Sequence, residues 1–245
     1  MAQLDSMNDG LDDNLRDKLV AIGKGVANLI PFAGGLIGEV VGLAIPTQRA
    51  DRIAQYLREL TLRVENLATE IKDRILLDEE MIDLIEEGGF QAARATSSER
   101  IHQIVEAVGR GLSEDDSFVV RKKRLLLIFG ELDNDEINLL NAFGRSYAGM
   151  DRNAFDRVNR PDPPHMQSQQ SELDANRLYE AGESHLVRLG LLRKNYGNIR
   201  RGETPEFNAQ SGDFKHNLEI SDLGRMLLKI IGLQTPFDEK QSELQ

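Results

Sequence analysis

Apolar residues recur at alternating steps of four and three over the stretch between residues 53 and 75. They are Ile53, Leu57, Leu60, Val64, Leu67, Ile71 and Ile75. This spacing places them along one face of an α-helix, and charged residues such as Arg58 and Glu65 occupy the other faces. The pattern predicts one long amphipathic helix over residues 48–87. We expect Gly88 and Gly89 to end it, because glycine favours the C-terminal end of a helix.

Three shorter helices are predicted between residues 90 and 150. The first covers about 90–95 and restarts at Ser97 or Ser98, a capping position, before an apolar face. That face contains Ile101, Ile104, Val105 and Val108. The second covers about 116–130, and the third begins at Asp133, with Glu136 at the spacing of a capping box. Residues 15–150 lack a sustained strand alternation and are therefore predicted to form an all-helical domain.

The pattern changes after residue 160. The stretch 160–171 has three prolines within four positions and reads as a linker. A helical pattern follows and ends at Gly190. A long polar stretch then leads to a short alternating strand at Leu218 and Ile220, a Ser221 cap and a final amphipathic helix. Residues 172–235 are thus predicted to form a winged-helix-like module. The polar ends, residues 1–14 and 236–245, read as tails.

The overall prediction is a mainly α protein. It consists of a glycine-rich apolar hairpin, a long amphipathic helix and a helical bundle, followed by a small winged-helix-like α+β module. Aromatic residues make up 5% of the chain and tryptophan is absent. The core must therefore consist mostly of Leu, Ile, Val and Ala, which suits packing of helix on helix.

Residues 26–46, VANLIPFAGGLIGEVVGLAIP, form an apolar glycine-rich segment. Gly34, Gly38 and Gly42 recur at every fourth position, so a helix would carry them on one face where another backbone can approach closely. Twenty-one helical residues span about 31 Å, close to the thickness of a bilayer's hydrocarbon core. These features favour an assembly helix or a membrane segment.

Two residues oppose membrane insertion of this segment. Glu39 lies near its centre, where a carboxylate is costly in lipid unless it is protonated, paired or facing water. Pro31 leaves only a short clean helix before Pro46. Soluble packing against the 48–87 helix, or oligomerisation, therefore stays open beside conditional insertion. A phosphate-binding loop is disfavoured, since no Gly-Lys-Ser/Thr ending follows the glycines.

The chain is acidic, with a formal net charge of −11 and an isoelectric point near 4.9. This charge argues against a protein that coats nucleic acid over its whole surface. Cysteine is absent, which excludes thiol chemistry, and the acidic start does not resemble a secretory signal. We expect a cytoplasmic protein that associates with the inner membrane only on activation.

Two basic clusters are candidate contacts for anionic lipid or nucleic acid. The first comprises Arg121, Lys122, Lys123 and Arg124. The second lies around the expected second helix and wing of the C-terminal module, and comprises Arg193, Lys194, Arg200 and Arg201 together with Arg188. A solvated helix face is the competing interpretation of the first cluster. Interleaved acids leave the second near neutral, which favours protein contact over DNA contact.

No catalytic motif is present, and we expect no enzyme activity, no cofactor and no metal. The four histidines lie far apart in the sequence and form no close ligand pair. They are His102, His165, His185 and His216.

The order of these features resembles the Abi-alpha family of bacterial abortive-infection proteins. The resemblance is carried by FVVRKKRLLLIFGELDNDEINLL, by LVRLGLL ending at Leu192, and by SDLGRMLL at 221–228. It implies a role in phage defence, in which the infected cell stops growing or dies. The resemblance supplies no catalytic or binding residues to carry over.

Two functions are therefore expected from the sequence. The first is a non-enzymatic phage-defence protein that forms homo-oligomers through the glycine-faced helix, responds to a partner protein or phage trigger, and perturbs the inner membrane. The alternative is a soluble dimeric regulator that binds DNA or protein through its C-terminal module.

Overall fold

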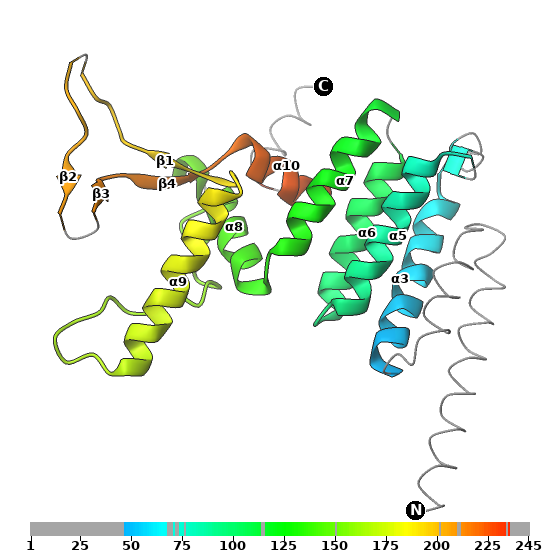
Figure 1. The fold of residues 1–245 in the computed structure, drawn as a ribbon, viewed down its shortest axis with the longest axis horizontal. Helices are drawn as coiled ribbons and strands as arrows, with labels where there is room; N and C mark the ends of the chain where they lie inside the picture. The colour runs from blue at the N-terminus through cyan, green and yellow to red at the C-terminus, as the bar shows by residue number, and fades with distance from the viewer. Residues whose placement is uncertain are drawn as a thin grey trace, which may run out of the picture. The chain divides into compact units, whose positions relative to one another are not determined.

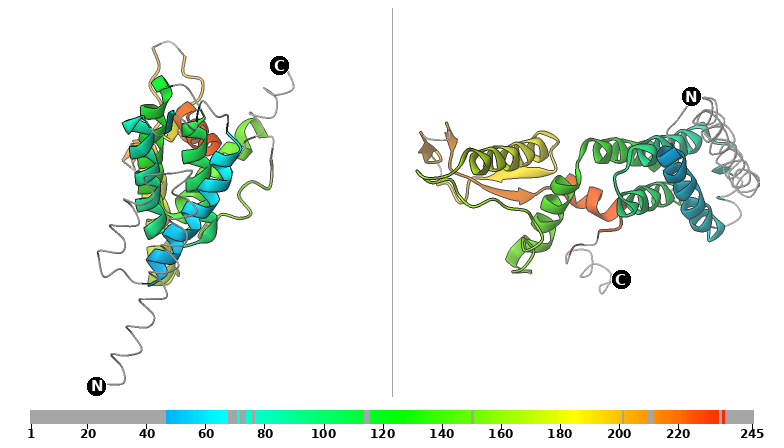
Figure 2. Two further views of the ribbon diagram at one scale, coloured as in Figure 1. Left: turned by 90° about the vertical axis from the view of Figure 1, so that its right-hand side faces the viewer. Right: turned by 90° about the horizontal axis from the view of Figure 1, so that it is seen from below.

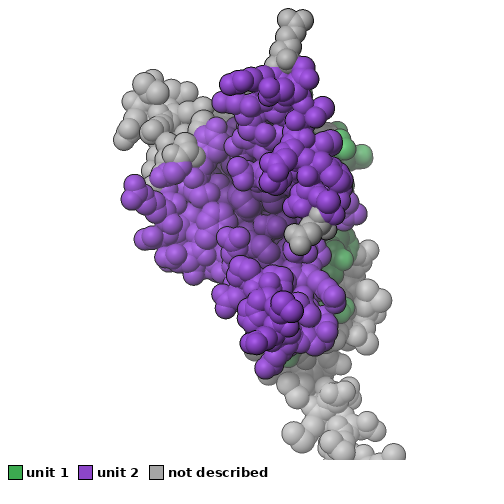
Figure 3. Space-filling model, turned by 90° about the vertical axis from the view of Figure 1, so that its left-hand side faces the viewer, with its two compact units in different colours: residues 1–130, 230–232 green, residues 131–229, 233–245 purple. Residues whose placement is uncertain are grey.

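A computed structural model describes residues 47–67, 71, 74–75, 77–113, 116–149, 151–200, 202–209, 212–233 and 235. The chain divides into two compact units, coloured separately in Figure 3: residues 1–130 with 230–232, and residues 131–229 with 233–245. The fold is mainly helical, with small antiparallel strand pairs near the C-terminus, as the sequence predicts. The glycine-rich segment, including Gly34, Gly38, Gly42 and Glu39, lies outside the described residues.

The described part of the first unit is built from helices. Helices α3 (Thr47–Glu65), α5 (Glu79–Arg94) and α6 (Ser98–Leu112) pack on one another, and Figures 1 and 2 show them side by side. Helix α7 (Asp116–Glu131) follows. Gln91 of α5 ties to it by donating a 2.8 Å hydrogen bond to the Leu126 carbonyl. The predicted apolar face of α6 is buried, and Ser97 caps the helix by accepting from the Arg100 amide.

The stretch 48–87 is not one helix, because α3 ends at Glu65 and α5 begins only at Glu79. Asp78 has an extended backbone, and its carboxylate accepts hydrogen bonds from the Glu80 and Met81 amides, so it is an N-cap. The heptad pattern hid this start because Asp78, Glu79 and Glu80 also read as a solvated helix face. Ile75, the last residue of the pattern, is nonetheless buried.

Gly88 and Gly89 do not end a helix either, since α5 continues through them to Arg94. Both are buried, and Gly88 faces Tyr56 of α3 and Val108 of α6. A Cβ at residue 88 would overlap the Tyr56 hydroxyl and lie 2.7 Å from Val108 Cγ2. Gly88 therefore allows three helices to pack closely, and steric space outweighs its low helix propensity.

Tyr56 makes this unit lose stability at high pH. Its hydroxyl donates a 2.8 Å hydrogen bond to the Ile85 carbonyl, and burial raises the pKa of the phenol far above its usual value of about 10. The folded state thus keeps its proton where the unfolded state loses it. The stabilisation is complete below about pH 10 and declines as the pH rises above that value, by about 1.4 kcal/mol per pH unit.

Tyr56→Phe provides the measurement. At neutral pH it should lower the free energy of unfolding by about 1 kcal/mol, because the hydrogen bond is lost. Above about pH 10 the difference from wild type should shrink and then reverse, since phenylalanine does not ionise. Urea unfolding followed by circular dichroism across this range checks it. A constant difference at all pH values would contradict the burial argument.

The second unit begins at α8 (Asn134–Ser146), which is followed by a 3₁₀ turn at Tyr147–Gly149 and later by α9 (Gln170–Arg188). Asp133 and Glu136 form the predicted capping box of α8. The remaining elements are β1 (Leu192–Asn195), β2 (Phe207–Asn208), β3 (Asp213–Phe214), β4 (Asn217–Ile220) and α10 (Asp222–Ile230). Strand β1 pairs antiparallel with β4, and β2 pairs with β3.

Helix α8 belongs to this second unit, whereas the sequence pattern grouped it with the preceding helices. It packs against α9 and β4. Gly144 of α8 makes room for the module's apolar side chains, because a Cβ there would lie 2.7 Å from Leu228 Cδ1. The predicted order of helix, strand, polar excursion, strand and helix holds from α9 to α10, and Ser221 caps α10 by accepting from the Gly224 amide.

Candidate functional site

A β-arm, described at residues 196–200, 202–209 and 212–216, extends from the sheet formed by β1 and β4. In the sheet, Leu192 pairs with Ile220 and Asn195 with Asn217, so the arm begins where this ladder ends. The second strand pair, β2 with β3, stiffens its outer part. In Figures 1 and 2 the arm projects beyond the helices of its own unit. Its side chains are therefore available to a partner.

The arm exposes large apolar side chains, which a folded protein normally buries. Phe207 is 57% exposed, Ile199 42%, Phe214 40% and Tyr196 39%. Phe207 and Phe214 are cross-strand partners whose rings meet edge to face, with centroids 5.7 Å apart. The Tyr196 and His216 rings make a similar contact at 5.8 Å. The rings thus hold one another in place while remaining open to solvent.

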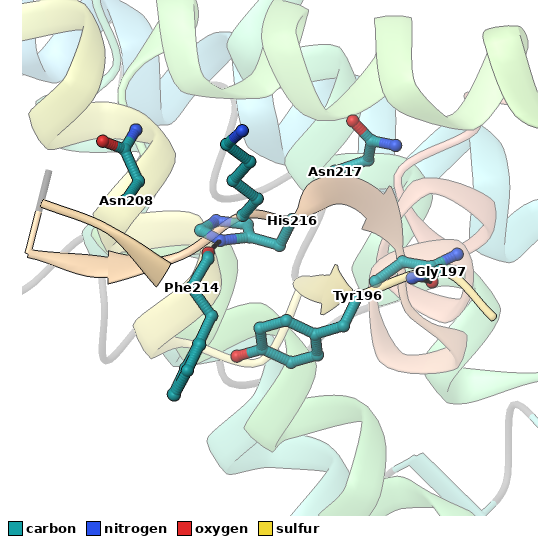
Figure 4. Close-up of a pocket in the computed structure, with 8 residues that line it drawn as sticks. Tyr196, Gly197, Asn208, Phe214, His216 and Asn217 are labelled. Atoms are coloured by element: carbon teal, nitrogen blue, oxygen red, sulfur yellow. Dashed lines mark hydrogen bonds between the residues drawn. The ribbon is translucent and has the colours of Figure 1, made fainter. Parts of the chain in front are cut away.

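A cleft of about 490 Å³ lies along the arm, close to its junction with the sheet. In Figure 4 the rings of Tyr196 and Phe214 project from one side of the strands, and the amides of Asn208 and Asn217 from the other. The alternation of side chains along a strand explains this division. The arm therefore offers an aromatic side and an amide side.

The basic residues of the arm and its sheet are largely neutralised by carboxylates. Arg193 lies opposite Glu219 across the sheet, with a nitrogen–oxygen distance of 3.4 Å. Lys194 donates a hydrogen bond to Asp213, which holds the pKa of that carboxyl below its usual value, and Lys215 lies 2.6 Å from Glu206. These pairs weaken the attraction of the arm for phosphate.

Helix α9, which leads into the sheet, is acidic. Its 19 residues include four carboxylates and two guanidinium groups. The carboxylates are Glu172, Asp174, Glu180 and Glu183, and the guanidiniums are Arg177 and Arg188. A helix that enters the DNA groove normally carries an excess of positive charge. The charge of α9 therefore disfavours DNA.

The two predicted basic clusters belong to different units. Residues 121–124 lie on α7 in the first unit, where Lys123 pairs with Asp83 of α5. The predicted residues Arg193, Lys194 and Arg200 lie in the second unit, and Arg201 is outside the described residues. Arg200 is exposed, and no described residue forms an ion pair with it.

His185 lies in α9 with its side chain only 21% exposed, and its Nδ1 lies 2.6 Å from Glu136 Oε1, a contact that the sequence spacing does not indicate. The aromatic side of the arm was also missed, because its rings are scattered through a polar stretch. Among the described residues, no cluster of three or more His, Cys, Asp or Glu side chains is arranged to hold a metal ion.

None of the helices in the described ranges is long and apolar enough to cross a membrane. Comparison with known proteins found no matching family model, no matching curated protein and no matching solved structure. Fold and site together define a mainly helical chain with a small α+β module that carries an exposed aromatic arm.

Proposed function

We propose that this protein is a non-enzymatic regulator whose C-terminal module binds a partner protein through the arm. The observation that carries the proposal is the exposure of Phe207, Phe214 and Tyr196 on a projecting hairpin. Aromatic residues are enriched where proteins bind one another, since they bury much area with few rotatable bonds.

Charge favours protein over nucleic acid as the partner. Single-stranded nucleic acid also stacks on aromatic rings, but its binding requires a positively charged track along the backbone. Arg193, Lys194 and Lys215 are each paired with a carboxylate of the same module. The exposed guanidiniums of Arg188 and Arg200 do not by themselves supply such a track. A polypeptide needs no neutralisation of phosphates and suits the arm better.

Site-specific photocrosslinking tests the proposal in bacterial cells that express the full chain. A benzoylphenylalanine replacing Phe207 should give a discrete crosslinked protein product after irradiation. The same group at the fully exposed Met166, in the segment before α9, should not. Phe214→Ser in the Phe207-labelled chain should reduce the product about tenfold, because it removes the neighbouring ring.

DNA binding is measured in parallel with a labelled duplex and a labelled single strand at low salt. We expect that neither the duplex nor the single strand binds the protein in a way that requires Arg193 or Arg200. Salt-sensitive binding weakened by Arg193→Ala and Arg200→Ala, together with no discrete crosslink from position 207, would contradict the proposal and favour a nucleic-acid reader.

Phage defence is the process we propose for this regulator, on the basis of the resemblance to abortive-infection proteins. The two C-terminal runs that carry the resemblance supply buried residues of the module, including Leu186, Leu191, Leu192, Leu227 and Leu228. In this chain these runs therefore contribute to the core of the module rather than to the exposed side chains of the arm. Phage plating on cells that express wild type or Phe207→Ser/Phe214→Ser tests the role: protection lost in the variant supports it, and no protection by either chain opposes it.

A further inference from the structure

A cavity of about 550 Å³ lies within the second unit, between α8, residues 158–161 and α9. It shares no lining residue with the cleft of the arm. Its walls contain apolar side chains from all three segments, among them Leu139, Val158, Pro161 and Leu178. Its volume falls within the range of protein pockets that bind small molecules or the side chains of a partner.

Helix α9 presents an unusually open face to this cavity. Leu186 is the only buried residue among the 19 of α9. Four other residues of α9 are spaced so that they share one helix face, and all of them line the cavity: Ala175, Leu178, Tyr179 and Gly182. Leu178 is 75% exposed. An amphipathic helix gains its stability by burying such a face, so α9 has room for a further packing partner.

The rim contributed by the start of α8 is negatively charged. Asp133, Asp135 and Glu136 line the cavity, and His185 is the one described lining residue with a basic side chain. Glu136 is held in place, because Oε2 accepts from the Asp133 amide and Oε1 lies 2.6 Å from His185 Nδ1. On the α9 side, burial raises the pKa of Glu183 above its usual value, an effect that the Arg160 guanidinium partly offsets.

We propose that this cavity is a groove, hereafter the groove, that docks a basic amphipathic helix of a partner protein. The apolar side chains of that helix would fill the space beside Leu178 and Leu139, and its lysine or arginine side chains would meet the carboxylates of Asp133 and Asp135. Two helices, α8 and α9, form the walls, and a third helix laid between them completes a common packing unit. Charge complementarity selects a basic partner over an acidic one.

Fluorescence anisotropy with the full chain tests the groove. The probe is a labelled amphipathic peptide of leucine and lysine, about 16 residues long, and its counterpart replaces each lysine by glutamate. We expect the lysine peptide to bind and the glutamate peptide not to bind. Leu178→Ser should weaken the lysine peptide about tenfold, because an apolar anchor is lost. Because Leu178 is 75% exposed, the substitution should leave folding intact.

Met166→Ser is the matched control, since it also removes an exposed apolar side chain but lies outside the groove. Unchanged affinity in Leu178→Ser would overturn the proposal, because it would mean that the peptide only follows the net negative charge. Equal weakening in both variants, or equal binding of the two peptides, would overturn it as well. The arm proposal is independent, since crosslinking from position 207 does not involve any lining residue of the groove.

Discussion

Gly224→Ala is expected to unfold the C-terminal module under conditions in which the wild-type module is folded. Gly224 lies in the first turn of α10, and a Cβ there would overlap the Leu191 carbonyl oxygen and lie 3.0 Å from Ile220 Cγ1. The Leu191 carbonyl already accepts the Ser221 amide at 3.0 Å, so it is fixed by the connection between β4 and α10. Because backbone rather than a flexible side chain must move, the free energy of unfolding of the module should fall by about 3 kcal/mol or more.

Gly182→Ala is the matched control within the same unit. Its Cβ would meet Glu136 Cγ at 3.6 Å, an ordinary contact, and Gly182 lies inside α9. Alanine should therefore be neutral or stabilising by up to about 1 kcal/mol. Thermal unfolding followed by circular dichroism compares the variants. Equal midpoints for Gly224→Ala and wild type would mean that the Leu191 carbonyl does not lie against the first turn of α10.

Gly88→Ala is expected to destabilise the helical unit by about 2–3 kcal/mol. The added methyl group would press on the Tyr56 hydroxyl and on Val108, both held in a close-packed core. Tyr56 cannot turn away without losing its hydrogen bond to the Ile85 carbonyl. Urea unfolding should show a lower midpoint, and the larger Gly88→Val substitution should lower it further.

Gly109→Ala tests whether the effect of Gly88→Ala comes from steric overlap or from replacing a helical glycine with any other residue. A Cβ at residue 109 would lie 2.7 Å from Arg63 Cγ, on a flexible side chain that can move aside. Its effect should thus be much smaller than that of Gly88→Ala. If Gly109→Ala proved equally destabilising, backbone conformation rather than the contact with Tyr56 would explain the result at Gly88.

The arm and the groove place two surfaces of different chemistry on one small module. The arm carries exposed aromatic rings with neutralised charge, whereas the groove combines apolar walls with an acidic rim. The variants at Phe207 and Leu178 act on separate residues, so each surface can be disabled while the other is intact. A partner that needs both would lose affinity in either variant.

Local signals in the sequence were sufficient for the starts of α6, α8 and α10. Ser97, Asp133 and Ser221 each cap the helix that their position predicts, because a short polar side chain satisfies the first amides without tertiary help. The apolar face of α6 and the strand at Leu218 and Ile220 were also predictable from the sequence, because side chains on one face recur about every 3.6 residues in a helix and about every 2 residues in a strand. The sequence alone thus determined the mainly helical class and the small α+β module.

Tertiary packing decided the features that periodicity leaves undetermined. The glycines at 88 and 89 would end a helix by propensity, but both lie inside α5, and at Gly88 the adjacent Tyr56 and Val108 leave no room for a Cβ. The exposed rings of the arm and the contact between Glu136 and His185 bring together residues far apart in the chain. Local sequence encodes where a helix can begin, whereas only the packed chain determines which surfaces are filled and which stay open.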